Sequence, residues 1–327
     1  MNTKKTFMTQ SRSITFSAVL LLILITGFSS SAQAVEGGRS LYLLGKRGPL
    51  AGLIPKPGWY ITNDFFYYNG STDQELPIAG IQSHNVSAEA TANLFQGTWI
   101  TDTRLGDARL AMSLLLPYSH MSTDAFAGTT YAGAPIELQV SDGVSNFGDP
   151  VLATSLGWRG GKDDRLRAWN IYASLFIPVG DYEEGRLANS GANRWGLDIG
   201  TAFSGGNKKR GREFSGVLGL TINGENLDTK YQSGIEAHLE LTYKQHVPGG
   251  FSAGLVGYGN LQLTPDSGGP DILGDFKGHV VGVGPEFAYQ FKIVEHTASA
   301  DLRWYHEFWA RNRVEGDTVF FTISFAL

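Results

Sequence analysis

The chain has 327 residues, with 26 Lys and Arg against 31 Asp and Glu, 42 Gly, 7 Trp and no Cys. This composition excludes collagen, coiled-coil and disulfide-stapled folds, and the absence of Cys excludes thiolate nucleophiles, iron–sulfur clusters and Cys-ligated zinc. The acidic balance differs from that of nucleic-acid-binding proteins, which need clustered Lys and Arg. We therefore expect an ordered, glycine-rich and aromatic-rich protein with no nucleic-acid partner.

Residues 1–34 have the pattern of a secretory signal peptide. Lys4, Lys5 and Arg12 precede an apolar stretch over 14–28, and Ala32-Gln33-Ala34 then supplies a small-x-small cleavage site. A retained membrane anchor is the alternative, but about 15 apolar residues fall short of the ~20 that a helical span needs. The sequence thus predicts export through a cleaved signal peptide.

The rest of the chain alternates between apolar and polar residues. In the closing segment, Val319, Phe321, Ile323 and Phe325 fall on one face and small or polar residues on the other, with Phe320 as the exception. This period of two is typical of a β-strand with one apolar face. Alternation alone also fits a soluble sandwich, so strand length and connector length have to distinguish the two folds.

The alternating segments are long. Most reach the roughly 9 to 11 residues that a tilted membrane strand requires, whereas sandwich strands have about 5 or 6. The expected strands are 58–69, 86–99, 107–120, 147–157, 165–179, 193–203, 212–222, 231–247, 251–263, 278–291, 296–309 and 316–327.

The connectors between these segments alternate in length. Short ones are expected at 100–106, 158–164, 204–211, 248–250 and 292–295, and mostly longer ones at 70–85, 121–146, 180–192, 223–230 and 264–277, while 310–315 departs from the rule. Short turns at one end and long loops at the other are typical of outer-membrane barrels, in which the turns face the periplasm.

Tryptophans fall near the ends of the expected strands, which is where the aromatic girdles of a membrane barrel lie. The alternative is that they anchor an ordinary core. Those near the short-turn end are Trp59, Trp99, Trp158 and Trp169, and those near the loop end are Trp195, Trp304 and Trp309.

Together these features predict an all-β fold, an antiparallel transmembrane β-barrel of about 12 strands over 58–327, with 10 or 14 as alternatives. Lipid offers no hydrogen-bond partners, so a lipid-facing sheet has to close on itself. The expected location is the bacterial outer membrane, with outer-membrane lipid and the barrel assembly machinery as partners. The chain ends in Leu327, where many outer-membrane proteins have Phe, which predicts weaker recognition by that machinery.

Charged side chains belong inside such a barrel, because Arg or Lys facing hydrocarbon costs about 2 to 4 kcal/mol at mid-depth. Two interpretations stay open: a network of ion pairs that seals the lumen, or a wet path with excess carboxylates. The predicted lumen-lining residues are Glu89, Asn93, Arg109, Asp198, Glu213, Glu236, His238, Glu240, Lys244, Glu286, Gln290, Asp301, Arg303 and Glu307.

Residues 35–57 are unusually apolar for a periplasmic tail. We expect this segment to fold back into the barrel as a hatch beside which hydrophobic solutes pass; a peripheral lead-in is the alternative. The predicted hatch residues are Leu41, Tyr42, Leu43, Leu44, Leu50, Leu53 and Ile54.

Motifs for catalysis or metal binding are weak. Residues 250–254 spell G-x-S-x-G around Ser252, but at a tight turn entering a strand, not in the strand–turn–helix context that a nucleophile needs. Acidic clusters at 181–184 and 266–275 are compatible with Ca²⁺ ligands, although solvated loops are the simpler interpretation. We expect no catalytic residues, no metal and no cofactor.

Several short strings resemble those of a known family. They are Glu36-Gly37-Gly38, Pro57-Gly58-Trp59-Tyr60, Gly180-Asp181-Tyr182-Glu183, Tyr231-Gln232-Ser233-Gly234, Gly274-Asp275-Phe276-Lys277-Gly278 and Arg311-Asn312-Arg313. Over nearly the whole mature chain, the sequence resembles the proteins grouped as "putative MetA-pathway of phenol degradation". The resemblance implies a non-enzymatic outer-membrane barrel that passes or binds small hydrophobic or aromatic compounds and is linked to aromatic catabolism. The alternatives are a structural or interaction barrel with a sealed lumen and an outer-membrane hydrolase.

Overall fold

The structure is a computed structural model that describes residues 39–74, 76–78, 81–131, 134–161, 164–268, 277–294 and 296–327. The predicted signal peptide, residues 35–38 of the predicted hatch segment and the acidic residues Asp271 and Asp275 lie outside these ranges. Within them, no helix has the length and apolar character needed to cross a membrane.

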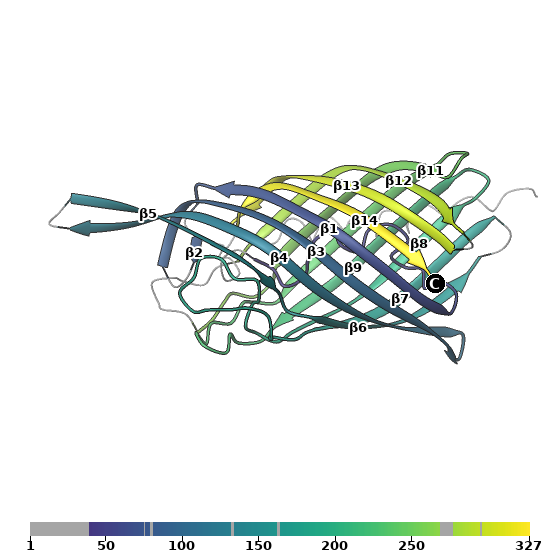
Figure 1. Ribbon diagram of the computed structural model, residues 1–327, viewed down its shortest axis with the longest axis horizontal. Helices are drawn as coiled ribbons and strands as arrows, with labels where there is room; N and C mark the ends of the chain where they lie inside the picture. The colour runs from purple at the N-terminus through teal and green to yellow at the C-terminus, as the bar shows by residue number, and fades with distance from the viewer. Residues whose placement is uncertain are drawn as a thin grey trace, which may run out of the picture. The chain divides into compact units, whose positions relative to one another are not determined.

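Twelve long strands in the described part of the chain close into an antiparallel barrel, because β1 pairs with both β3 and β14 (Figure 1). Two further strands, β2 (Leu76–Ile78) and β5 (Ala134–Phe147), pair with β3 and β4. The barrel strands are β1 (Gly58–Thr72), β3 (Ile81–Leu105), β4 (Ala108–Tyr131), β6 (Val151–Gly160), β7 (Arg165–Phe176), β8 (Gly196–Asn207), β9 (Arg212–Asn223), β10 (Glu236–His246), β11 (Phe251–Gln262), β12 (His279–Ile293), β13 (His296–Arg311) and β14 (Glu315–Ala326).

The predicted 12-stranded barrel is confirmed, with two corrections to its long connectors. The sequence predicts a connector over 70–85, but β1 continues to Thr72, β2 spans Leu76–Ile78 and β3 starts at Ile81. The sequence predicts a loop over 121–146, but β4 continues to Tyr131 and β5 starts at Ala134, so the two strands form a hairpin that reaches beyond their neighbours (Figure 1). This stretch contains β-branched residues such as Thr129, Ile136 and Val140, which favour extended backbone. The long connections at the loop end are 177–195, 224–235 and 263–278.

The outer face of the barrel is apolar and exposed. Leu239 and Leu241 of β10 are exposed, while the residues between and beside them are buried in the interior. Tryptophans lie on this outer face: Trp59 stacks on Trp99, and Trp158 stacks on Trp169 with ring centroids 4.1 Å apart. Both pairs lie near the short-turn end, as aromatic girdles do, so the alternative that they anchor the core is wrong.

One apolar cluster lies inside the barrel. Phe320, the exception to the alternation of β14, points inward and is fully buried with Phe66 and Tyr305. Tyr42 and Leu44, which precede the first strand, belong to the same cluster. Part of the chain before β1 therefore lies inside the barrel, and the candidate site is the lumen around this part.

Candidate functional site: the barrel lumen

One wall of the lumen is charged. It is formed by the inner faces of β8, β9, β10, β12 and β13, where polar residues alternate with exposed apolar ones. The predicted lumen residues that are buried on this wall are Asp198, Glu213, Glu236, His238, Glu240, Lys244, Glu286, Asp301, Arg303 and Glu307. Gln290 lies on the inner face of β12 near the short turns, and Arg109 on the inner face of β4.

Asn93 is a correction to the lumen set, because it lies on the outer face of β3, whereas Glu89 is exposed and is among the residues that line the cavity. Their neighbours Val86, Ala92 and Leu94 point inward and are buried. Asn93 instead accepts a hydrogen bond from Asn63 of β1 on the outer face, with 3.3 Å between the amide nitrogen and oxygen. The prediction failed because it assumed a polar inner face, whereas the inner face of β3 is largely apolar.

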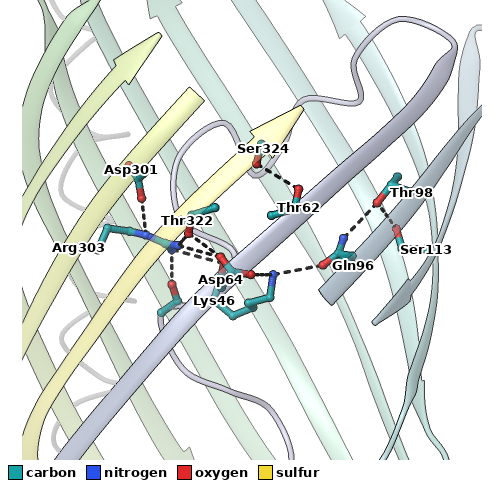
Figure 2. Close-up of polar contacts among 12 residues, drawn as sticks. Lys46, Thr62, Asp64, Gln96, Thr98, Ser113, Asp301, Arg303, Thr322 and Ser324 are labelled. Carbon is teal, nitrogen blue, oxygen red and sulfur yellow. Dashed lines mark hydrogen bonds and ion pairs between the residues drawn. The ribbon is translucent and has the colours of Figure 1, made fainter. Parts of the chain in front are cut away.

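Arg303 is the centre of a polar cluster at the junction of β13, β14 and β1 (Figure 2). Its guanidinium lies 2.7 Å from Asp301 and 3.7 Å from Asp64, and it donates a 2.8 Å hydrogen bond to Thr322. It also donates to the backbone oxygen of Gly45 at 2.5 Å. Arg303 therefore connects three strands to the segment that precedes β1.

Further polar pairs extend the charged wall across β8 to β12. Lys244 of β10 lies 2.5 Å from Glu286 of β12, and His238 lies 2.9 Å from Asp198 of β8 with both side chains fully buried. Buried charges are tolerated only when they are paired or hydrogen-bonded. The partners come from different strands, so these pairs fix the relative positions of the strands.

Residues 39–57 bind to this wall, and Glu240 is the main contact. Its carboxylate accepts hydrogen bonds from the Tyr42 hydroxyl at 2.9 Å, from the Gly45 amide at 2.8 Å and from the Gly48 amide at 3.3 Å. The Tyr42 ring also stacks on His238, with centroids 3.6 Å apart. One buried carboxylate thus holds three successive groups of the segment.

The segment extends along the barrel from the loop end to the short-turn end. Arg39 donates to the backbone of Asn189 in the loop 177–195 at 2.6 Å. At the other end, the Gly52 amide donates to Ser204 of β8 at 2.9 Å, and Arg109 donates to the Pro55 oxygen at 2.6 Å. All seven predicted hatch residues, from Leu41 to Ile54, are buried or half-buried.

Glycines let the segment lie directly on the barrel wall. A Cβ on Gly52 would lie 2.4 Å from the carbonyl carbon of Phe203, which is closer than real Cβ atoms approach. Gly45 has φ +81°, and a Cβ there would lie 2.9 Å from the Tyr305 ring. Both positions need glycine, one for close approach and the other also for its left-handed backbone.

The opposite wall, from β1 through β3 and β4 to β6, is more apolar. A cavity of about 1100 Å³ lies between it and the segment and also reaches Lys244, Asp301 and Arg303 of the charged wall. Its apolar lining includes Ala90, Ala92, Leu94, Leu115, Pro117, Val151 and Ala153, together with Leu41 and Leu43 of the segment. Sequence reasoning missed this wall because both faces of β3 carry apolar residues, so alternation does not identify the inner one.

The G-x-S-x-G string does not have the strand–turn–helix context of a nucleophile elbow. Ser252 lies within β11 and faces the lumen, and its register partner is His246 of β10. His246 is bonded to Glu213 at 2.9 Å, but among the described residues no hydrogen bond joins it to Ser252. In the same ranges, no group of three His, Asp or Glu side chains is arranged to hold a metal ion.

Comparison with known proteins identifies a family and similar solved structures. The family model described as "Putative MetA-pathway of phenol degradation" matches residues 67–323. Among solved structures, the COG4313 outer membrane channel from Pseudomonas putida F1 has a TM-score of 0.65 at 16% identity, covering 84% of this chain and 98% of that one. A FadL homologue from Pseudomonas aeruginosa has a TM-score of 0.42 at 8% identity, covering 85% and 92%. No curated protein matches the chain.

Proposed function

The chain belongs to the "Putative MetA-pathway of phenol degradation" family, and on this premise we propose that it is an outer-membrane channel for small hydrophobic or aromatic compounds. The observation that carries the proposal is the division of the lumen into two unlike walls. The charged wall holds residues 39–57 in place, and the apolar wall faces a cavity of about 1100 Å³. Contact between an apolar solute and the apolar wall is favourable because it removes apolar surface from water. Contact with the charged wall is unfavourable, because the solute cannot replace the hydrogen bonds of the charged groups.

The segment 39–57 acts as a hatch in this proposal. It leaves the cavity beside β3 and β4, so solutes move between the segment and the apolar wall. Cavities of about 300 to 1000 Å³ accommodate drug-sized ligands, so a single-ring aromatic compound fits without expulsion of the segment.

Deletion of residues 36–54 tests this function. In vesicles reconstituted with the full chain, we expect uptake of an aromatic solute above that of empty vesicles. In the deletion variant, ion conductance rises and the solute preference is lost, because the wall opposite β3 and β4 is gone. If conductance and uptake are the same with and without the segment, the hatch is wrong; if the full chain gives no flux at all, the lumen is sealed and the channel function is wrong.

A further inference from the structure

The apolar wall of the cavity changes character along β3 and β4. Leu94 of β3 and Leu115 of β4 are apolar, and both line the cavity. Leu115 is the register partner of Gln96, and the next inward-facing pair towards the short turns is Thr98 with Ser113. A solute on Leu94 and Leu115 therefore lies beside three polar side chains.

The three polar residues form one chain of hydrogen bonds that starts at Lys46 of the segment (Figure 2). Lys46 Nζ lies 3.1 Å from Gln96 Oε1, Gln96 Nε2 lies 3.1 Å from Thr98 Oγ1, and Thr98 Oγ1 lies 2.9 Å from Ser113 Oγ. An ammonium group can only donate, so the Gln96 oxygen accepts and its NH₂ group donates onward to Thr98. The donor and the acceptor are thus determined for each hydrogen bond from Lys46 to Thr98, and only the bond between the two hydroxyls can run either way.

Of the two hydroxyl protons of Thr98 and Ser113, one has no hydrogen-bond acceptor among the described residues. Thr98 and Ser113 share a single hydrogen bond, in which either can be the donor. Whichever hydroxyl accepts in that bond keeps its own proton, and no further acceptor for either hydroxyl is found in the described parts of the chain. Both line the cavity, so the spare donor is available to an oxygen atom of a molecule inside it.

The charge balance selects a neutral ligand. The Lys46 ammonium lies 2.7 Å from the carboxylate of Asp64, so its charge is already compensated. A carboxylate ligand beside Gln96 would have to compete with Asp64 for Lys46. A hydroxyl or carbonyl oxygen needs only the spare proton.

We propose that Gln96, Thr98 and Ser113 form a binding site for the polar group of an uncharged solute with a compact apolar body and one acceptor oxygen, such as a ring that carries a hydroxyl group. The apolar body lies on Leu94 and Leu115, and the oxygen accepts from the Thr98–Ser113 pair. The inference rests on the proposed function and names the solute class that the channel prefers.

Equilibrium binding of para-cresol and para-xylene tests the site, because the two molecules have the same shape and differ by a hydroxyl in place of a methyl. We use the full chain in lipid nanodiscs, isothermal titration calorimetry and empty nanodiscs as the blank. One added hydrogen bond in the site predicts that para-cresol binds about fivefold to tenfold tighter than para-xylene. In Thr98→Val with Ser113→Ala, this ratio falls to about one while binding of para-xylene is unchanged.

The matched control is Ser119→Ala with Ser190→Ala, which removes another hydroxyl pair that lines the cavity, 3.1 Å apart, but lies farther towards the loop end and has no hydrogen bond to Lys46, Gln96, Thr98 or Ser113. It should keep the wild-type ratio. The site is overturned if the wild-type ratio is already one, if the Thr98/Ser113 variant keeps it, or if the control loses it equally. Gel mobility before and after boiling confirms that each variant folds. Absence of flux in vesicles would overturn the proposed function but not the site, because binding is measured without transport.

Discussion

Lys46 of the lumenal segment and Asp64 of β1 form an ion pair of 2.7 Å in which the carboxylate is 1% exposed (Figure 2). Asp64 also accepts a hydrogen bond from Thr322, and Arg303 lies 3.7 Å away. The pair joins the segment to the wall opposite Glu240. The segment is therefore bound to both walls of the lumen, to Glu240 on one side and to Asp64 on the other.

Lys46→Met should destabilise the barrel, because it removes the closest cation from a buried carboxylate. A fully unpaired buried charge costs about 3 to 5 kcal/mol, and Arg303 reduces this to about 2 kcal/mol. The measurement is the temperature at which the heat-modifiable band shifts on gels. Lys46→Met combined with Asp64→Leu should recover most of the loss. Equal decreases in this temperature in the single and double variants would show that the ion pair does not contribute to the stability of the barrel.

Glu240→Leu should release the segment from the charged wall. Tyr42, Gly45 and Gly48 would each lose their acceptor in a buried site, at about 1 to 3 kcal/mol per group. We expect a larger single-channel conductance in planar bilayers and faster proteolysis within 39–57. Glu240→Gln keeps one acceptor oxygen and should give an intermediate result. Wild-type conductance in Glu240→Leu would contradict the assigned contact.

Gly52→Val should displace the lower part of the segment, since its Cβ would meet the backbone of Phe203 and Ser204 at 2.4 to 2.5 Å. The displaced residues 50–55 should become accessible to protease from the short-turn end. Gly97→Val on the outer face of β3 is the matched control, because nothing lies within 4 Å of its Cβ position. We expect cleavage within 50–55 in Gly52→Val and none in Gly97→Val.

The stability of the loop that carries Asp266 should decrease as the pH rises. Burial raises the pKa of Asp266 to about 6, although its carboxylate accepts hydrogen bonds from Tyr231, Gly234 and Gln262. The ordinary value is about 3.9, so the folded loop holds a proton that the unfolded loop has lost between these two values. Its stabilising contribution is therefore full below pH ~4 and decreases as the pH rises towards about 6.

Hydrogen exchange of residues 263–268 measures this effect, after correction for the intrinsic pH dependence of exchange. Protection should be higher at pH 4.5 than at pH 7.5 in the wild type. Asp266→Asn cannot ionise and should show the same protection at both values. A pH dependence that persists in Asp266→Asn would assign the effect to another group.

The barrel could be predicted from the sequence because its signals are local. Alternation over 316–327 identifies a strand with an apolar face without knowledge of its neighbours, and Phe320 alone departs from it. The same rule fails at Asn93, because the inner wall of β3 is largely apolar and the rule assumes a polar lumen. The sequence-based assignment fails again over 121–146, where β4 extends to Tyr131 and pairs with β5 (Ala134–Phe147).

The contacts of the lumenal segment could not be predicted from one sequence. Tyr42 and Glu240 are separated by 198 residues, and Lys46 and Gln96 by 50. Nothing local indicates which strand receives each group of the segment. The apolar character of 41–54 suggests burial, but the positions of Gly45 and Gly52 have a physical reason only once Tyr305 and β8 lie beside them.

The central claim is that solutes move between residues 39–57 and the apolar wall of β3 and β4. The chain has no native Cys, so a single Leu115→Cys can be modified with a small methanethiosulfonate reagent in planar bilayers. The account predicts that modification occurs in the folded channel and reduces both single-channel current and solute uptake. Ala202→Cys, which replaces a buried residue packed near Ala51 on the opposite wall, should not react. An inert Leu115→Cys, or one whose modification leaves current and uptake unchanged, would contradict it.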